Sequence, residues 1–126
     1  MWPLLLRKIF GPSPVPAKFK GFPEEMAVRP SQIRASAAES ALMIPAAYAL
    51  QEHYRLLQMP VAIVAGEDDR LIEIEQSEDL HDEIPHSSFT RVAGSGHMVH
   101  QTATMKVMEA IDRVGTLPAP ARAALN

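Results

Sequence analysis

The chain has 126 residues, of which 47% are apolar and 21% are charged, and this composition is that of one small folded domain rather than a disordered segment. Its formal charge of −3 and its scattered lysines and arginines give no basic surface for nucleic acid, so we expect no such partner. The absence of cysteine excludes a disulfide framework, a thiolate metal site and a cysteine nucleophile, and it fits a reducing compartment, which we take to be the cytoplasm.

The first thirty residues give little sign of regular structure. In the opening stretch MWPLLLRKIF the apolar run is short and the charges Arg7 and Lys8 follow it instead of preceding it, so we predict no signal peptide. Prolines and glycines recur through residues 11–30, and because proline removes a backbone donor, this segment is predicted to be a connector. No apolar stretch approaches the roughly 20 residues needed to cross a bilayer, so we predict no membrane span in this chain.

Two helices are predicted before the middle of the chain. Ser31 is a candidate N-cap, and the alanine-rich stretch QIRASAAESALM predicts a helix over about 32–43. Pro45 is expected to break or restart this helix, because a helix interior needs the N–H that proline lacks. The stretch AAYALQEHYRLLQ, residues 46–58, then predicts a second helix with its apolar residues on one side.

From Pro60 onward, strands and helices alternate. The run VAIVA is apolar, has the length of a strand and is bounded by proline and glycine, which is typical of a strand covered on both faces in a parallel sheet. A helix, a strand and a helix follow, over about 73–83, 88–93 and 102–114, so we predict a parallel βαβ unit. Two strands make a poor sheet by themselves, and further strands are expected outside this chain.

Polar side chains follow both predicted strands. Glu67, Asp68 and Asp69 come directly after the first, and Ser95 and His97 come after the second between glycines. The carboxyl ends of adjacent parallel strands meet at one edge of a sheet, so an acid and a histidine 28 positions apart (97 minus 69) are expected to come together there. Such a pair is two-thirds of a nucleophilic triad, in which a carboxylate orients an imidazole that acts as general base and then as acid.

The stretches PVAIVAGEDDRL and VAGSGHMVH resemble the last two catalytic loops of the α/β-hydrolase fold. The resemblance implies that Asp69 is the triad acid, at the fourth place of Gly-x-x-Asp, and that His97 is the triad base, at the end of Gly-x-Gly-His. The fold class it implies is α/β, the C-terminal part of an α/β-hydrolase fold, with two parallel strands and flanking helices preceded by cap helices. The likeness is strong over residues 59–112 and looser over 1–58.

The resemblance also implies how the chain is divided. Residues 1–58 are expected to be a partial helical cap region with a Pro-rich connector, residues 59–114 the core segment, and residues 115–126, rich in Pro and Ala, a loose tail. Met98 and Val99 are expected to contact a small-molecule substrate because they directly follow His97. No organic cofactor and no metal ion is implied.

The nucleophile is missing from the pattern. No Gly-x-Ser-x-Gly occurs in the chain, and Ser95, framed as AGSGH, belongs to the histidine loop, although it would be the first candidate if the chain were active alone. We therefore expect Met1 to be an internal methionine or a truncated start, and the oxyanion hole to lie elsewhere. The complete protein would hydrolyse ester-like or related substrates by a nucleophile-His-Asp mechanism. The alternative is a non-catalytic truncated fragment, or a chain that pairs with a complementary N-terminal half.

Other interpretations of these side chains stay open at this point. Asp68 is the rival acid, and Asp69 could instead be an ordinary loop or helix-capping residue. His97 could be a structural histidine. A metal site would use His97 and His100, with the acids and further histidines as additional ligands, but the spacing fixes no compact third ligand. The further histidines of that alternative are His81 and His86.

Overall fold

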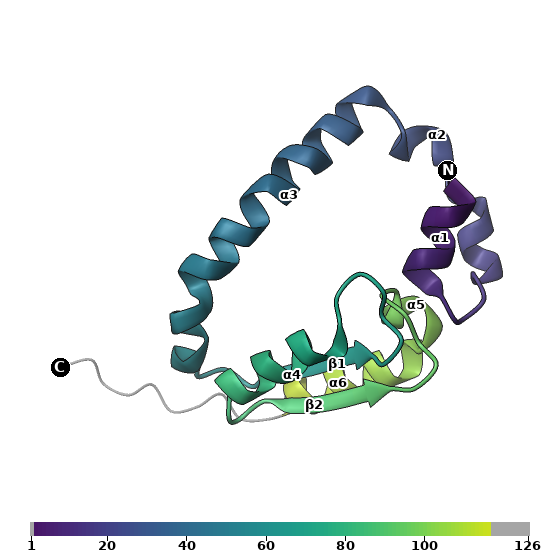
Figure 1. Ribbon diagram of the computed structural model, residues 1–126. Coiled ribbons are helices and arrows are strands. Elements are labelled where there is room, and N and C mark those ends of the chain that lie inside the picture. Colours follow the sequence, from purple (N-terminus) through teal and green to yellow (C-terminus); the bar gives the residue numbers. More distant parts are fainter. Residues whose placement is uncertain (1, 117–126) are drawn as a thin grey trace.

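A computed structural model describes residues 2–116 of the chain (Figure 1). Its first half is helical, with η marking short 3₁₀ helices, and contains α1 (Trp2–Phe10), η1 (Ala17–Gly21), α2 (Glu24–Ala27), α3 (Pro30–Leu50) and η2 (Gln51–Leu56). Strands enter only in the second half, which contains β1 (Ala62–Gly66), α4 (Ile74–Glu83), β2 (Ser88–Val92), α5 (Val99–Thr102) and α6 (Thr104–Thr116).

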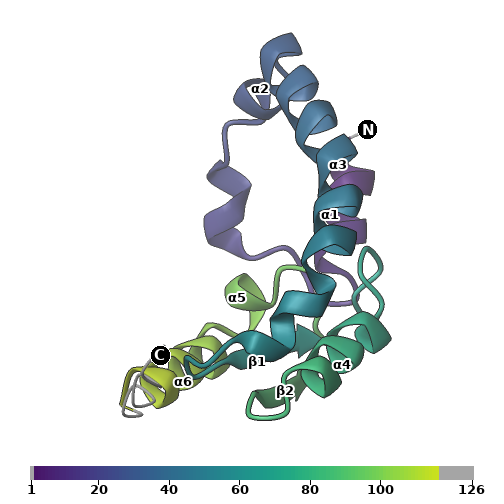
Figure 2. The same ribbon diagram turned by 90° about the vertical axis from the view of Figure 1, so that its left-hand side faces the viewer.

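The two strands form a parallel sheet flanked by helices. Ala62 of β1 lies opposite Ser88 of β2, and the register continues to Gly66 opposite Val92. Helices α4 and α6 both contact β1, and Figure 2 shows them on opposite sides of it. The predicted parallel βαβ unit with flanking helices is therefore confirmed, with β1 starting one residue later than the apolar run VAIVA.

The core of this unit is small. Among the described residues, four apolar side chains are buried, namely Phe10, Ile84, Val92 and Ala110. The residues of β1 before Gly66 are only half-buried, because a sheet of two strands leaves the outer edge of each strand unpaired and each face partly open.

Helix α3 corrects the prediction of two helices separated at Pro45. It runs without interruption from Pro30 to Leu50, and all of its residues are exposed (Figure 1). A proline removes one N–H from the helical ladder, and on an exposed helix water can satisfy the carbonyl that this N–H would have bound. The predicted N-cap is also wrong, since the helix begins at Pro30 with Arg29 before it and no side chain caps it. Proline suits the first helical position because its φ is already that of a helix.

The end of the second predicted helix is likewise different from the expectation. After Leu50 the chain tightens into the 3₁₀ helix η2, which ends at Leu56. The last predicted helix, over about 102–114, corresponds to α6, and the short helix α5 before it was not predicted. Ala103, with φ −131°, separates α5 from α6, and the hydroxyl of Thr104 donates to the carbonyl of His100 at the end of α5 (2.9 Å).

The first thirty residues contain more structure than predicted. Helix α1 was not expected, and the connector holds η1 and α2, each beginning directly after a proline. Four aromatic side chains from α1, from η1 and from the residue that follows η1 pack against one another here. Phe10 and Phe19 meet edge to face at 5.0 Å between centroids, Phe19 stacks on Phe22 at 5.2 Å, and Phe22 stacks on Trp2 at 5.7 Å.

Helix α6 continues to Thr116, past the predicted end of the last helix at about residue 114. Its apolar residues Val107, Ala110 and Val114 recur at helical spacing and favour a further turn. Residues 117–126, the rest of the predicted tail, lie outside the described residues. None of the helices within residues 2–116 has both the length and the apolar character that crossing a membrane requires.

Candidate active site

The carboxyl end of β1 comes very close to the loop that follows β2. A Cβ at Gly66 would lie 2.3 Å from the carbonyl oxygen of Ser95 and 2.5 Å from that of Gly96, so this approach requires glycine. The backbone N–H of Asp68 donates to the carbonyl of Ser95 at 3.0 Å. The acid loop, residues 66–72, and the histidine loop, residues 93–98, are thus joined through their backbones.

The carboxylate of Asp69 accepts three hydrogen bonds. Its Oδ1 accepts from the backbone N–H of Leu71 at 2.8 Å and from that of Ile72 at 3.1 Å. Its Oδ2 lies 2.8 Å from Nδ1 of His97. One oxygen is therefore held by the backbone of the acid loop, and the other faces the imidazole of the histidine loop.

The surroundings of Asp69 lower the pKa of its carboxyl. Partial burial by itself raises the pKa of this carboxyl, but the N–H of Leu71, the ring of His97 and the N–H of Ile72 together lower it by more. The pKa of Asp69 consequently lies below its ordinary value of 3.8. At neutral pH the carboxylate carries its charge and can stabilise positive charge on the imidazole.

His97 is the more exposed residue of the pair. Its side chain is 41% exposed, against 12% for Asp69. Because Nδ1 donates its proton to the carboxylate, the neutral ring carries its lone pair on Nε2. Gly94, with φ +70°, lets the chain turn from β2 into the histidine loop. An imidazole held in this tautomer and open on its other side can accept a proton from a group placed before it.

The comparison with protein families agrees with this geometry. A model of the alpha/beta hydrolase fold family matches residues 3–104, a range that includes both loops. The chain belongs to this family. The family assignment that rested on the two loops is thereby confirmed. Comparisons with curated proteins and with solved structures gave no significant match.

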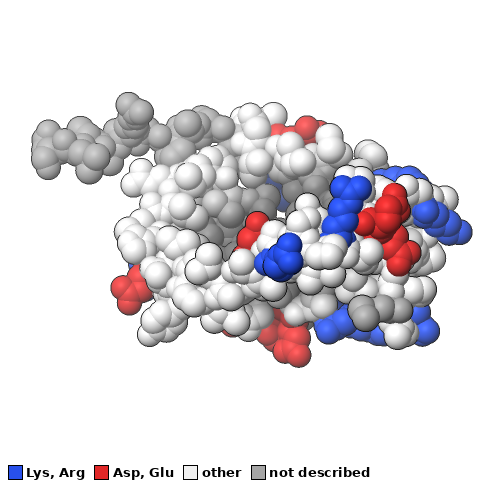
Figure 3. Space-filling view, turned by 90° about the horizontal axis from the view of Figure 1, so that it is seen from above, with Lys and Arg blue, Asp and Glu red and all other residues white. Residues whose placement is uncertain are grey.

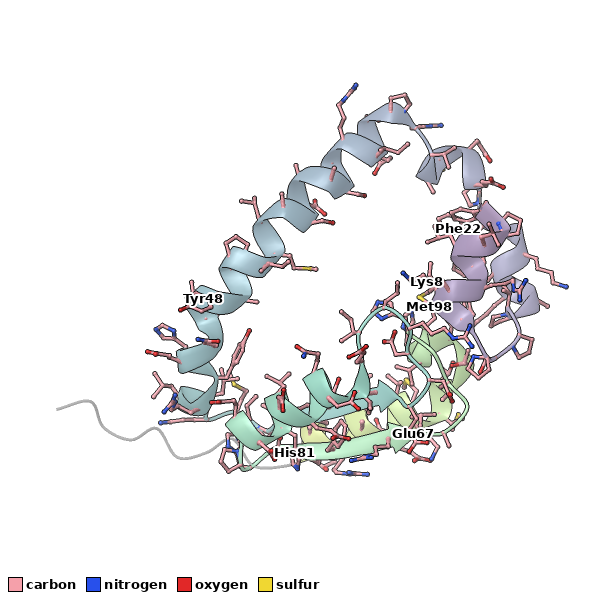
Figure 4. All side chains as sticks on the ribbon, in the orientation of Figure 1. Lys8, Phe22, Tyr48, Glu67, His81 and Met98 are labelled. Carbon is pink, nitrogen blue, oxygen red and sulfur yellow. The ribbon has the colours of Figure 1, made fainter. Side chains whose placement is uncertain are left out.

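Of the two candidate acids in this alpha/beta hydrolase chain, the one that meets the histidine is Asp69. Asp68 is exposed, and its backbone N–H, which donates to Ser95, is the only part of it that takes part in a hydrogen bond within residues 2–116. Glu67 likewise lies at the carboxyl end of the sheet and is exposed (Figure 4). The interpretation of Asp69 as an ordinary loop acid accounts for its Oδ1 but leaves the contact of its Oδ2 with His97 unexplained.

The structure does not support Ser95 as a nucleophile. The residue is only 3% exposed, and its Oγ lies 2.5 Å from Oγ1 of Thr102. Its hydroxyl is therefore buried and bonded to α5 instead of His97. Two further serines, Ser36 and Ser40, lie on α3, and both are exposed.

The two residues predicted to contact substrate lie in different surroundings. Val99 lines a cavity of about 290 Å³ together with His100 and apolar residues of β1 and α6. Met98 is half-buried, and its backbone N–H donates to the carbonyl of Ile9 at 3.4 Å. Figure 4 shows Met98 close to the end of α1. Contact of either side chain with substrate stays a prediction.

The metal alternative finds no ligand set in the described part of the chain. No three histidines or acids within residues 2–116 lie together in a way that could hold a metal ion. Nδ1 of His81 lies 2.6 Å from Oγ of Ser87, and Nε2 of His86 lies 3.0 Å from the carbonyl of Met59. Figure 4 shows His81 at the opposite end of the sheet from Glu67, so it is far from the acid loop.

The histidine loop has a third partner that was not predicted, the end of α1. A Cβ at Gly96 would lie 2.6 Å from the carbonyl oxygen of Gly11 and 2.9 Å from that of Ile9. The hydroxyl of Ser13 donates to the carbonyl of Gly94 at 2.5 Å. Each contact involves a backbone carbonyl, which every residue type carries, and joins segments far apart in the sequence, so local residue patterns did not reveal it.

The charges on one face of the molecule are mixed in sign. Figure 3 shows Lys and Arg beside Asp and Glu on the face that it draws, with uncharged atoms over much of the rest. No uniformly basic region is visible on that face, in agreement with the formal charge of −3.

Proposed function

We propose that this chain supplies the acid and the base of a hydrolase that cleaves ester-like or related small-molecule substrates. The observation that carries the proposal is the 2.8 Å contact between Oδ2 of Asp69 and Nδ1 of His97. The match to the alpha/beta hydrolase fold family supports the same reaction class. The ionised carboxylate and the exposed imidazole are the two groups that acyl transfer to water requires beside a nucleophile.

In this mechanism His97 moves the protons. Its Nε2 takes the proton of a serine hydroxyl as that oxygen attacks the carbonyl carbon, and it then gives the proton to the leaving oxygen of the ester. In the second half of the reaction the ring takes a proton from water, whose oxygen attacks the acyl group, and returns it to the serine. Asp69 holds the ring with Nδ1 protonated and stabilises the imidazolium, and it remains ionised throughout.

The serine would come from a complementary N-terminal half of the hydrolase. The chain contains no Gly-x-Ser-x-Gly, and the one serine of its histidine loop is buried against Thr102. Within residues 2–116 nothing pairs with the outer edge of β1, and the cavity that borders β1 and α6 is mainly apolar, which supports a partner beside β1. That half would also carry the oxyanion hole.

The coding sequence upstream of Met1 tests this proposal. We expect it to encode an in-frame Gly-x-Ser-x-Gly, and the extended chain to hydrolyse a short-chain p-nitrophenyl ester. His97→Ala in the extended chain should abolish this hydrolysis, whereas His86→Ala, which changes a histidine bonded to Met59 at the other end of the sheet, should not. Hydrolysis that survives His97→Ala would contradict the proposal.

The second candidate is a non-catalytic chain. It is favoured by the absence of a nucleophile elbow in these 126 residues. The upstream sequence separates the two, because an upstream region without an in-frame elbow, together with no ester hydrolysis by the extended chain, would favour the non-catalytic interpretation.

A further inference from the structure

A chain of hydroxyl groups spans the histidine loop. The hydroxyl of Thr102 donates to the carbonyl of Met98 at 3.3 Å, and its Oγ1 lies 2.5 Å from Oγ of Ser95. Each hydroxyl has one proton to donate, so Ser95 must be the donor to Thr102. These two hydrogen bonds therefore link Ser95 through Thr102 to Met98. His97 lies between Ser95 and Met98 in the sequence.

Ser95 and Met98, which lie on either side of His97 in the sequence, also form backbone hydrogen bonds to residues outside the histidine loop. The carbonyl of Ser95 accepts from the N–H of Asp68, and the N–H of Met98 donates to the carbonyl of Ile9. The ring of His97, by contrast, is bonded within residues 2–116 to Asp69 alone. The place of the ring beside Oδ2 of Asp69 therefore also depends on where the backbone on either side of His97 is held.

The loop needs such bonds because its own sequence is permissive. Gly94 and Gly96 stand on either side of Ser95, and glycine has more backbone freedom than any other residue. Ser95 is 3% exposed, so its hydroxyl must find a partner inside the protein or remain unpaired at a cost in free energy. Thr102 is that partner, and it comes from α5, which begins two residues after His97.

We propose that Ser95 and Thr102 are a positioning pair, which holds residues 95–98 so that the ring of His97 stays on Oδ2 of Asp69. The inference rests on the proposed function, since it concerns the same acid and base. It gives Ser95 a part in the reaction that is different from attack on the substrate. Neither residue touches the reacting atoms, and both act through His97.

The test measures which nitrogen of His97 carries the proton in the folded chain. Long-range ¹H–¹⁵N correlation spectra at about pH 8, above the ordinary histidine pKa, report the two tautomers of each ring. The signals of His97 are identified by their absence in His97→Gln. The variants are Thr102→Val and Ser95→Ala, which remove one hydroxyl each, and Thr102→Ser, which keeps it.

In the unchanged chain and in Thr102→Ser we expect His97 to be protonated mainly at Nδ1. In Thr102→Val and Ser95→Ala the fraction protonated at Nδ1 should fall about twofold or more, because the ring is no longer held on the carboxylate. The matched control is Thr104→Val, which removes a hydroxyl that donates to His100 outside the loop. It should leave the tautomer of His97 unchanged.

The positioning role would be overturned if Thr102→Val and Ser95→Ala lowered the melting temperature but left His97 fully protonated at Nδ1. That outcome would make the pair merely structural, and the proposed function would stand. If Thr102→Val fails to fold, Ser95→Ala decides, because it leaves the hydroxyl of Thr102 bonded to Met98. Absence of the Nδ1 proton in the unchanged chain would overturn both the positioning role and the acid–base pair.

Discussion

Oδ2 of Asp69 lies 2.8 Å from Nδ1 of His97, although the two residues are 28 positions apart in the sequence. The contact joins the ends of two parallel strands, because Gly66 lies opposite Val92 at the last pair of the sheet. A helix lies between these strands in the sequence, so the pair exists only when the βαβ unit is folded.

We predict that Asp69→Asn reverses the tautomer of His97. The amide has one oxygen, and this oxygen should take the place of Oδ1, where the N–H groups of Leu71 and Ile72 both donate. The amide NH₂ would then face Nδ1 and donate to it, which moves the ring proton to Nε2. Long-range ¹H–¹⁵N spectra measure the change. A ring still protonated at Nδ1 would contradict the role that we assign to the two backbone donors.

The acid dependence of stability should report the same carboxyl. Because the pKa of Asp69 is lowered in the folded chain, its contribution to the free energy of unfolding is complete at pH above the ordinary value of 3.8. The contribution is lost as the pH falls through the lowered folded pKa. Urea unfolding of the chain and of Asp69→Asn, from about pH 7 to about pH 2, should show a difference that shrinks in acid. A difference that stays constant over this range would count against the lowered pKa.

Gly66→Ala should disturb the close packing of the acid loop against the histidine loop. The new Cβ would lie 2.3 Å from the carbonyl oxygen of Ser95, which is backbone and cannot turn aside. We expect a loss of about 1–3 kcal/mol in the free energy of unfolding, measured by urea denaturation. Gly115→Ala is the control, because a Cβ there meets nothing within 4 Å. Equal effects of the two changes would show that the close approach at Gly66 is unimportant.

Phe10→Ala should destabilise the chain strongly. Phe10 is 0% exposed and meets Phe19 edge to face, so its removal leaves a cavity at the end of α1. The expected loss is about 3–5 kcal/mol in the free energy of unfolding. Phe22→Ala, at a position that is 43% exposed, should cost clearly less. A loss for Phe10→Ala as small as that expected for Phe22→Ala would mean that Phe10 does not belong to the core.

Local chemistry was enough to predict the βαβ unit and the pair at its end. The apolar run before Gly66 indicated a strand, and the acids and the histidine followed the two strands at the positions where parallel strands bring their loops together. Proline was a poorer guide. Pro45 lies inside α3, and Pro16 and Pro23 precede short helices, because proline disfavours only certain places in a helix and fits others.

The sequence by itself thus determined the two parallel strands and the family, and it predicted that an acid of the first loop meets His97, since each depends on residue types at fixed local spacing. Only the tertiary structure decided that Asp69 rather than Asp68 meets His97, that Ser95 is buried against Thr102, and that the end of α1 contacts the histidine loop. The physical reason is that these choices depend on the direction of a side chain at the end of a strand and on backbone carbonyls. Neither can be deduced from residue types alone, because both arise only when the chain folds.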